Sequence, residues 1–263
     1  MAEYVPLKYY FDEQLAVRLS TLIKPHYPLF PQDAFIREVA NKVINKELKQ
    51  RVEIITDLLK DNLPENYIDT LNILLHCLGP ENSKEEGMFK EGYFLMPVAF
   101  FVEKYGINHM DASLKALYEI TKRHTSEYAI RPYLNENMEL CILYLEKWIN
   151  DENSHVRRLV SEGTRPRLPW AKKMEPIKND PANNLQLLEK LINDPSKYVQ
   201  KSVANHINDL TKDYPEEVLT WLEKNVIYKN SYQPKIVIHG LRTLLKNKDD
   251  QATKLVEIMR GKV

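Results

Sequence analysis

Apolar residues recur at spacings of three and four along most of the chain, which is the period of an amphipathic α-helix. Between residues 33 and 60 this pattern runs on and predicts helix, with Asp33 as the cap of its start. A second apolar face covers residues 67–78 and stops at Gly79-Pro80, a pair that ends helices. The same spacing predicts further helices over residues 111–121, 136–149, 154–162, 183–193, 196–210, 215–224 and 233–246.

Two of these helical segments repeat with an offset of 43 residues. The run LEKWIND at residues 145–151 aligns with LEKLIND at 188–194, and the match continues through the turn into residues 154–158 and 197–201. A period of about 40–47 residues with two helices per unit is typical of HEAT repeats, which stack into a curved solenoid. Chance similarity of two amphipathic hairpins is the alternative, but the match within the turn argues against it.

The repeat predicts an all-α fold, a HEAT-like α-solenoid of stacked antiparallel helix pairs. We expect a single domain over residues 1–263, with N-terminal helices over 1–80, a polar loop or boundary over 81–92, and repeats over 93–263. Pro97 suits the first turn of a helix and Gly106 suits its end. In such stacks the second helix of each unit lines the concave face, so Glu162 and its repeat equivalent Asn205 are candidates for a binding surface.

Composition excludes several classes of protein. The chain has only 7 glycines in 263 residues, which disfavours all-β folds and folds that bind phosphate on glycine-rich loops. Cys77 and Cys141 form no C-x-x-C pair, so we expect reduced, buried thiols in a cytoplasmic protein. The N-terminus does not read as a secretory signal, and the longest apolar run, residues 93–101, is too short to cross a membrane.

The formal net charge is zero, with 37 basic and 37 acidic residues, which at first disfavours a protein that coats nucleic acid. That total conceals a basic segment over residues 157–178, in which only Glu162 and Glu175 oppose seven cations. Two prolines and Gly163 make its centre a rigid loop that presents arginines and Trp170, the residue types that hold phosphates and stack on bases. The alternative is a basic loop paired to acidic neighbours, with Trp170 buried. The seven cations are Arg157, Arg158, Arg165, Arg167, Lys172, Lys173 and Lys178.

Three carboxylates on neighbouring predicted helices, Glu127, Glu162 and Asp209, lie near this segment. Carboxylates beside a basic, aromatic cleft suit hydrolysis through a cationic, oxocarbenium-like transition state. An alternative role for Glu127 is a surface ion pair with Arg131, four residues further on. An alternative role for residues 205–209 is a polar network that links adjacent repeats. Neither a zinc motif nor a nucleotide-binding loop is present, so we predict no metal and no nucleotide cofactor.

Taken together, these residues resemble the DNA alkylation repair glycosylases of the HEAT-like superfamily, and within it the AlkC branch. The motifs that carry the resemblance are NDEN at 150–153 running into VRR and SEGTRPRLPW at 156–158 and 161–170, SE-x-AIRP at 126–132, and VANH-x-ND at 203–209.

The resemblance implies a monofunctional enzyme that removes cationic N3-alkylated bases, chiefly 3-methyladenine and also 3-methylcytosine, from double-stranded DNA. It assigns Glu127, Glu162 and Asp209 as catalytic acids, and Arg158 and Trp170 as the arginine and the aromatic residue of the cleft. Some family members carry an immunoglobulin-like C-terminal domain, which we do not expect within residues 1–263. The residues that we expect to bind DNA are Arg157, Arg158, Arg165, Arg167, Trp170, Lys172, Lys173, Asn205 and His206.

Two non-enzymatic functions compete with this hypothesis. A HEAT scaffold for a protein partner predicts an apolar or acidic groove, and the basic segment argues against it. A DNA-structure-binding protein without chemistry predicts the loss of a cleft acid, but all three are present. We therefore expect a monomeric, cytoplasmic, nucleoid-associated protein whose partner is duplex DNA with alkylated bases.

Overall fold

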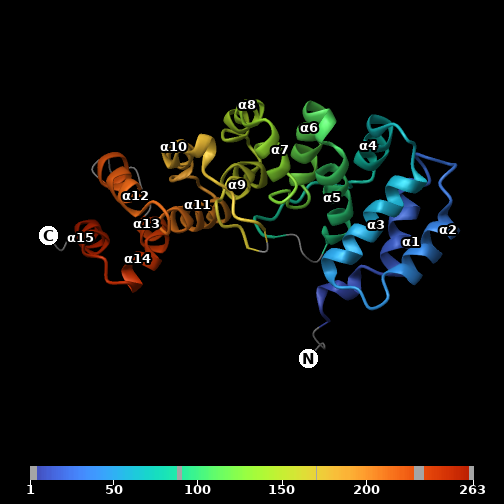
Figure 1. Cartoon of the computed structure of the whole chain (residues 1–263), viewed down its shortest axis with the longest axis horizontal. Coiled ribbons are helices and arrows are strands. Elements are labelled where there is room, and N and C mark those ends of the chain that lie inside the picture. Colours follow the sequence, from blue (N-terminus) through green and yellow to red (C-terminus); the bar gives the residue numbers. More distant parts are fainter. Residues whose placement is uncertain (1–4, 88–90, 170, 228–233, 261–263) are drawn as a thin grey trace. The chain divides into compact units, whose positions relative to one another are not determined.

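The structure, a computed structural model, describes residues 5–87, 91–169, 171–227 and 234–260. These residues form α-helices, short 3₁₀ helices and one π-helical segment, with no β-strand among them (Figure 1), so the predicted all-α class is confirmed. They divide into two compact units, the first made of residues 1–83 and 87–133 and the second of residues 84–86 and 134–263. None of the helices in this described part is long and apolar enough to span a membrane.

The first unit packs its helices into a bundle in which α1 lies against α2, α3 against α2 and α5, and α6 against α4 and α5. Packing of α5 and α6 onto these N-terminal helices explains why the units divide near residue 133 and not within the polar stretch 81–92. Its helices are α1 (Glu13–Ile23), α2 (Gln32–Lys42), α3 (Leu48–Asn62), α4 (Tyr67–His76), α5 (Met96–Tyr105) and α6 (Met110–Thr121). Short 3₁₀ helices span Leu7–Tyr10, Tyr93–Leu95 and Ile107–His109, and α7 (Arg131–Glu136) contains the boundary between the units.

The helical pattern over residues 33–60 is interrupted in the structure, which corrects that prediction. Helix α2 ends at Lys42, and Asn45 takes a left-handed backbone conformation with φ 55°. A capping box between Glu47 and Gln50 then starts α3. The predicted cap was also wrong, because Asp33 lies in the first turn of α2 and Pro31 precedes it at the N-cap position.

Gly106, predicted to end a helix, is the C-cap of α5, and three hydroxyl groups converge on it. A Cβ atom at this position would overlap the hydroxyls of Tyr67, Ser113 and Tyr133. The three groups are held in place, because Tyr67 Oη lies 2.7 Å from Ser113 Oγ, Ser113 donates to Gly106 O over 2.9 Å, and Tyr133 donates to Val102 O over 2.5 Å.

We therefore expect Gly106→Ala to lower the free energy of unfolding by about 1–3 kcal/mol, because an added methyl group overpacks a buried site. Urea unfolding followed by circular dichroism measures this change. Gly87→Ala is the matched control, since a Cβ there meets nothing within 4 Å. Equal midpoints for the two variants would contradict the packing argument.

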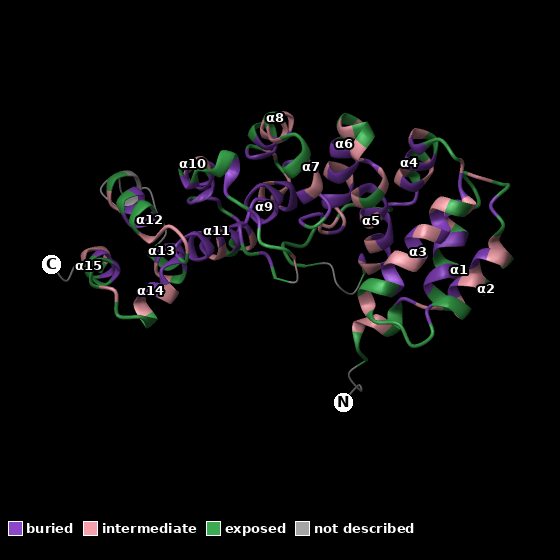
Figure 2. Ribbon diagram, in the orientation of Figure 1, coloured by how far each residue is buried: buried purple, intermediate pink, exposed green. Residues whose placement is uncertain are grey.

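The second unit consists of helix pairs arranged in two layers (Figure 1). Helices α8, α10 and α12 form one layer, and α9, α11 and α13 form the other, with α11 packed between α9 and α13. Figure 2 shows α9 and α11 mostly buried, whereas α8 and α10 have exposed faces. The helices are α8 (Met138–Trp148), α9 (Ser154–Gly163), α10 (Pro181–Leu191), α11 (Lys197–Leu210), α12 (Pro215–Trp221), α13 (Pro234–Gly240), α14 (Arg242–Lys246) and α15 (Asp250–Met259). A 3₁₀ turn spans Ile177–Asn179 and the π-helical segment spans Leu222–Ile227.

The 43-residue repeat is confirmed in the helix bounds. Helices α8 and α10 begin at residues 138 and 181, and α9 and α11 begin at residues 154 and 197. Their side-chain caps are equivalent too, since Asn153 caps α9 and Ser196 caps α11. The predicted helix over 233–246 is divided into α13 and α14, at the point where Gly240 lies so close to Ile207 of α11 that a Cβ would approach Ile207 Cγ2 to 2.7 Å.

Both cysteines are buried and free, as predicted. Burial raises the pKa of the Cys77 thiol to about 11 and that of Cys141 to about 12. At neutral pH the two thiols are therefore protonated, and they behave as small apolar side chains within the two cores.

Candidate functional site

Adjacent second helices bring Glu162 and Asp209 together in the second unit. Glu162 lies near the end of α9, and Asp209 lies near the end of α11. Arg165, in the loop that leaves α9, joins them: its Nη1 donates to Glu162 Oε1 over 2.6 Å and its Nε donates to Asp209 Oδ2 over 2.8 Å. The Glu162 and Asp209 side chains are only 8% and 3% exposed, so this guanidinium bridge holds two buried carboxylates.

Electrostatics explains why Arg165 can be buried here. Burial by itself lowers the pKa of Arg165, but Glu162 and Asp209 outweigh that effect and leave the pKa above its usual value. The guanidinium is therefore a permanent cation between two anions. Because its planar fork binds both carboxylates at once, it fixes their separation as well as neutralising part of their charge.

Two further cations and one hydroxyl complete the surroundings of the carboxylates. Arg158 Nη2 lies 3.7 Å from Glu162 Oε1, and its guanidinium stands over the Tyr198 ring at 4.6 Å from the centroid. Lys212 Nζ lies 3.5 Å from Asp209 Oδ1, and Ser202 Oγ donates to Glu162 Oε2 over 2.6 Å. We call Glu162, Arg165, Ser202 and Asp209 the carboxylate cluster.

Arg157, predicted to bind DNA, is bonded inside the protein. Its Nε and Nη2 donate to the Asp194 carboxylate over 2.6 and 3.0 Å, and its Nη1 donates to Asp151 O over 2.7 Å. In the next repeat Gln200 donates to Asp194 O over the same 2.7 Å. An uncharged residue therefore makes the equivalent backbone contact, which indicates that Arg157 joins repeats and that its contact with DNA stays a prediction.

The exposed end of the basic segment is also paired. Arg167 donates to both oxygens of Asp213 over 2.6 and 3.2 Å, and Lys173 Nζ lies 3.2 Å from the same carboxylate. The hydrogen bond to Arg167 lowers the pKa of Asp213. Arg167 and Lys173 nevertheless stay about two-fifths exposed, and Lys172 is also exposed, so all three side chains reach the surface. Trp170 lies outside the described residues.

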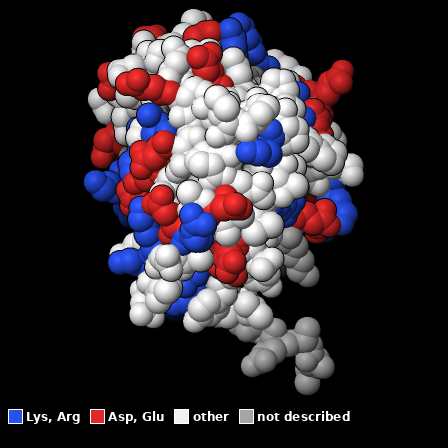
Figure 3. Space-filling model, turned by 90° about the vertical axis from the view of Figure 1, so that its right-hand side faces the viewer, with Lys and Arg blue, Asp and Glu red and all other residues white. Residues whose placement is uncertain are grey.

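These contacts revise the interpretation of the charge pattern. The acidic residues that balance residues 157–178 are not distant, because Asp194, Asp209 and Asp213 lie directly against the arginines. The alternative of a basic loop paired to acidic neighbours is therefore confirmed for those arginines. Figure 3 shows the face at which α1 and α2 lie, where basic and acidic side chains are interspersed and no field of one sign forms.

Residues 205–209 link adjacent repeats, as one of the two interpretations of this segment predicted. Asn205 Oδ1 accepts from Arg242 over 3.2 Å, and Asn208 Oδ1 accepts from Thr243 Oγ1 over 2.8 Å. Both partners lie in α14, so side-chain hydrogen bonds tie α11 to the helices that follow α13.

His206 belongs to the same network and is fully buried. Its Nδ1 lies 2.9 Å from Ser161 O, and its Nε2 lies 3.0 Å from the Asn184 amide nitrogen. Because an amide nitrogen only donates, this pairing requires a neutral ring with its proton on Nδ1. The direct contact between His206 and DNA that the sequence predicted is not supported, since the ring has no exposed atom and instead joins α9, α10 and α11.

Glu127, the third predicted acid, lies in the first unit, in the loop between α6 and α7. Glu127 and Arg131 are each only 7% exposed, so the alternative of a surface ion pair is wrong. His124 is buried in the same loop, and burial lowers its pKa to about 4, so the ring is neutral at physiological pH. A catalytic role for Glu127 stays a prediction.

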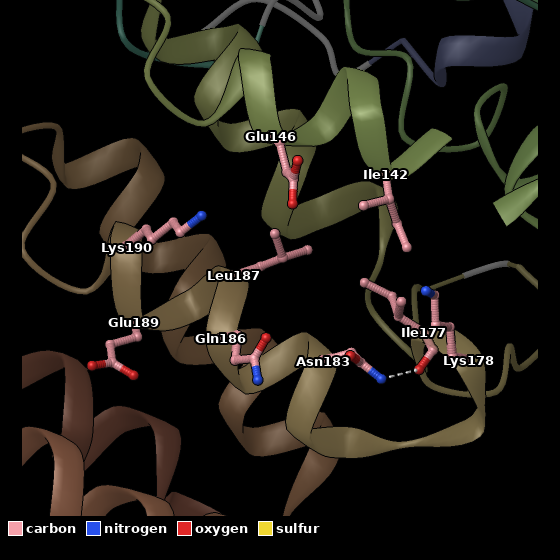
Figure 4. Close-up of a pocket in the computed structure, with 9 residues that line it drawn as sticks. All are labelled: Ile142, Glu146, Ile177, Lys178, Asn183, Gln186, Leu187, Glu189 and Lys190. Atoms are coloured by element: carbon pink, nitrogen blue, oxygen red, sulfur yellow. Dashed lines mark hydrogen bonds between the residues drawn. The ribbon is translucent and has the colours of Figure 1, made fainter. Parts of the chain in front are cut away.

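A separate hollow of about 460 Å³ opens between α8 and α10 (Figure 4). Ile142, Ile177 and Leu187 form its apolar part, and the charged side chains at its rim are two lysines and two glutamates. It contains none of the predicted site residues. Within the described ranges, no group of three or more His, Cys, Asp or Glu side chains is placed to hold a metal ion.

The fold and the cluster define a class of protein: a helical-repeat protein that holds carboxylates on the second helices of adjacent repeats. Residues 121–239, which include the cluster, match the family model described as DNA alkylation repair enzyme. The chain is similar to the uncharacterized protein YhaZ of Bacillus subtilis (strain 168), with 37% identity over 250 residues that cover 95% of this chain and 67% of YhaZ.

A solved structure is similar over the same length. The alkylpurine DNA glycosylase AlkC of Pseudomonas fluorescens, bound to DNA that contains an abasic site analogue, superposes with a TM-score of 0.84 and is 30% identical. The match covers 96% of this chain and 68% of that one. The chain therefore belongs to the DNA alkylation repair enzyme family, in the AlkC branch, as the sequence motifs predicted.

Proposed function

We propose that this chain is a DNA glycosylase that hydrolyses the N-glycosidic bond of alkylated bases in duplex DNA, as a step of base excision repair. The observation that carries the proposal is the carboxylate cluster, in which two buried anions are held at a fixed separation by Arg165. The similarity to an alkylpurine DNA glycosylase seen with an abasic site analogue supports the same reaction here.

The chemistry of the substrate fits a site made of carboxylates. An N3-methylated adenine carries a formal positive charge, so when the bond between C1′ and the base breaks, the electron pair neutralises the leaving base. Positive charge then develops on the deoxyribose, and water adds to C1′ and gives up a proton. Fixed carboxylates in a site of low dielectric stabilise this positive charge more than water does.

We propose 3-methyladenine as the main substrate and 3-methylcytosine as a second one, because both are cationic before cleavage and neutral after it. Glu162 is the acid that we place nearest to the reacting sugar, since it is the more exposed of the two carboxylates in the cluster. We propose that Asp209 acts beside it, and that Glu127 is the third catalytic acid, as the sequence motifs imply.

Binding of DNA rests on the exposed cations. Arg167, Lys172 and Lys173 offer positive charge at the surface, and Arg158 stands beside Glu162. Arginine and lysine side chains hold the phosphates that flank a lesion and offset the cost of bending the duplex. We propose that a monomer binds alkylated duplex DNA on a concave face of the repeats, in the cytoplasm and at the nucleoid.

We expect the purified protein to release free 3-methyladenine from methylated duplex DNA in a buffer that contains EDTA and no nucleotide. Chromatography of the free bases measures the product, and DNA incubated without protein is the control. Binding to duplex DNA should also weaken steeply with salt, because phosphate contacts release counterions. Binding without any base release above the control would contradict the glycosylase and favour a non-catalytic DNA-binding module.

A further inference from the structure

Ser202 has no role in the sequence motifs, yet it contacts the most exposed carboxylate of the cluster. It lies on α11, is 2% exposed, and donates to Glu162 Oε2 over 2.6 Å. A second hydroxyl, that of Ser161 on α9, lies 3.0 Å from Ser202 Oγ. Ser161 is fully buried, so the Ser202 hydroxyl contacts both a buried hydroxyl group and the Glu162 carboxylate.

The direction of these hydrogen bonds follows from proton counting. A serine hydroxyl has one proton and two lone pairs. The carboxylate of Glu162 only accepts, and it lies closer to Ser202 Oγ than Ser161 Oγ does, at 2.6 against 3.0 Å, so the single proton of Ser202 points to Glu162.

Each oxygen of the Glu162 carboxylate therefore accepts a hydrogen bond from a different residue. Arg165 donates to Oε1 over 2.6 Å, and Ser202 donates to Oε2 over 2.6 Å. A glutamate side chain has three rotatable torsions, and its terminal torsion is broad when nothing restrains it. One bond at each oxygen fixes the plane of the carboxylate and its rotation, which is what a group must have before it can face a reacting atom.

We infer that Ser202 is a positioning residue for Glu162: its hydroxyl orients the carboxylate toward the sugar. This inference rests on the proposed glycosylase function. It assigns Ser202 no contact with DNA, so the loss of its hydroxyl should slow the chemical step and leave DNA binding unchanged.

The test is Ser202→Ala in the full chain, with single-turnover release of 3-methyladenine from a duplex that carries one lesion. We expect the rate constant to fall about tenfold, in line with the loss of a hydrogen bond to a charged group. The dissociation constant for duplex DNA with an abasic site analogue should stay within twofold of the wild type.

Two further variants separate orientation from packing. Ser202→Cys fills the same space but offers only a weak donor, so its rate should resemble that of Ser202→Ala. Ser20→Ala is the matched control, because Ser20 is also fully buried but donates only to Ala16 O, in α1 of the first unit. We expect Ser20→Ala to keep the wild-type rate.

Several results would overturn the inference. Wild-type kinetics in Ser202→Ala, or wild-type kinetics in Ser202→Cys with a loss only in Ser202→Ala, would show that the hydroxyl is dispensable or serves packing alone. A lower rate in Ser202→Ala together with weaker binding of duplex DNA would also assign it a structural role. If the wild type itself released no base, the proposed function would fail and the positioning role with it, a result distinct from failure of the Ser202 variants alone.

Discussion

Glu162→Gln should release 3-methyladenine at least about 100-fold more slowly than the wild type in single-turnover experiments, the usual effect of removing one preorganised electrostatic group. The amide has no net charge to stabilise the cationic sugar. It also cannot accept from both Arg165 and Ser202, because one of its two ends is an NH₂ group that donates. DNA that carries an abasic site analogue should still bind, since the variant loses no phosphate contact.

Asp209→Asn should give a smaller loss than Glu162→Gln, because the Asp209 side chain is the more deeply buried of the two. The matched control for both variants is Asp57→Asn in the first unit. Asp57 is likewise a carboxylate with more than one partner, accepting from Lys104 over 2.7 Å and from Tyr105 over 2.6 Å. Rates for Glu162→Gln and Asp209→Asn within twofold of the wild type would show that the site assignment is wrong.

Arg165→Gln should be the most destabilising substitution in the carboxylate cluster. Removing the guanidinium leaves two buried carboxylates without their shared cation, and breaking a buried ion pair from one side costs about 3–5 kcal/mol of unfolding free energy. Urea unfolding measures the loss, and base release measured at a temperature where the variant is folded should also fall. Arg165→Lys should recover only part of both, because an ammonium group lacks the planar fork that binds two carboxylates.

The same variant tests whether Arg165 holds the carboxylates or binds phosphate, the role that the sequence predicted for it. Each phosphate contact contributes about 0.9 to the slope of log affinity against log salt. We expect that slope to be unchanged in Arg165→Gln and reduced by about 0.9 in Lys172→Gln, since Lys172 is exposed and Arg165 is buried. A reduced slope in Arg165→Gln would restore Arg165 to the residues that contact DNA.

The helical class and the repeat could be predicted because their signals are local. Apolar spacing marks the buried face of each helix, and the run LEK-x-IND marks the same turn in two repeats. Helix α2 and helix α3 were predicted as one because apolar residues recur at spacings of three and four in both segments, and the interruption depends on the backbone conformation of Asn45. Helix α15 was not predicted, although Asp249 caps its start with a side-chain bond to Ala252 N.

The candidate acids could be named from residue types and motifs, but their partners could not. Arg165 and His206 were both placed among the residues that contact DNA, because arginine and histidine in a polar run are typical of a binding face. In the structure the first binds two carboxylates and the second is fully buried. Ser202 was missed because a serine within a helix carries no sequence signal, and only its 2.6 Å bond to Glu162 distinguishes it.

The amino-acid order was sufficient for the all-α class, the 43-residue period and the family, since each depends on neighbours within one or two turns or on a recurring motif. Which arginine pairs with which aspartate was decided only by the tertiary structure. The pairs Arg157–Asp194, Arg165–Asp209 and Arg167–Asp213 are 37, 44 and 46 residues apart. Those separations are close to one repeat, because residues about one period apart face each other across α9, α11 and the loops that follow them. A basic segment in the sequence thus becomes, through the stacking of repeats, a set of arginines paired with carboxylates, while Lys172 and Lys173 stay exposed.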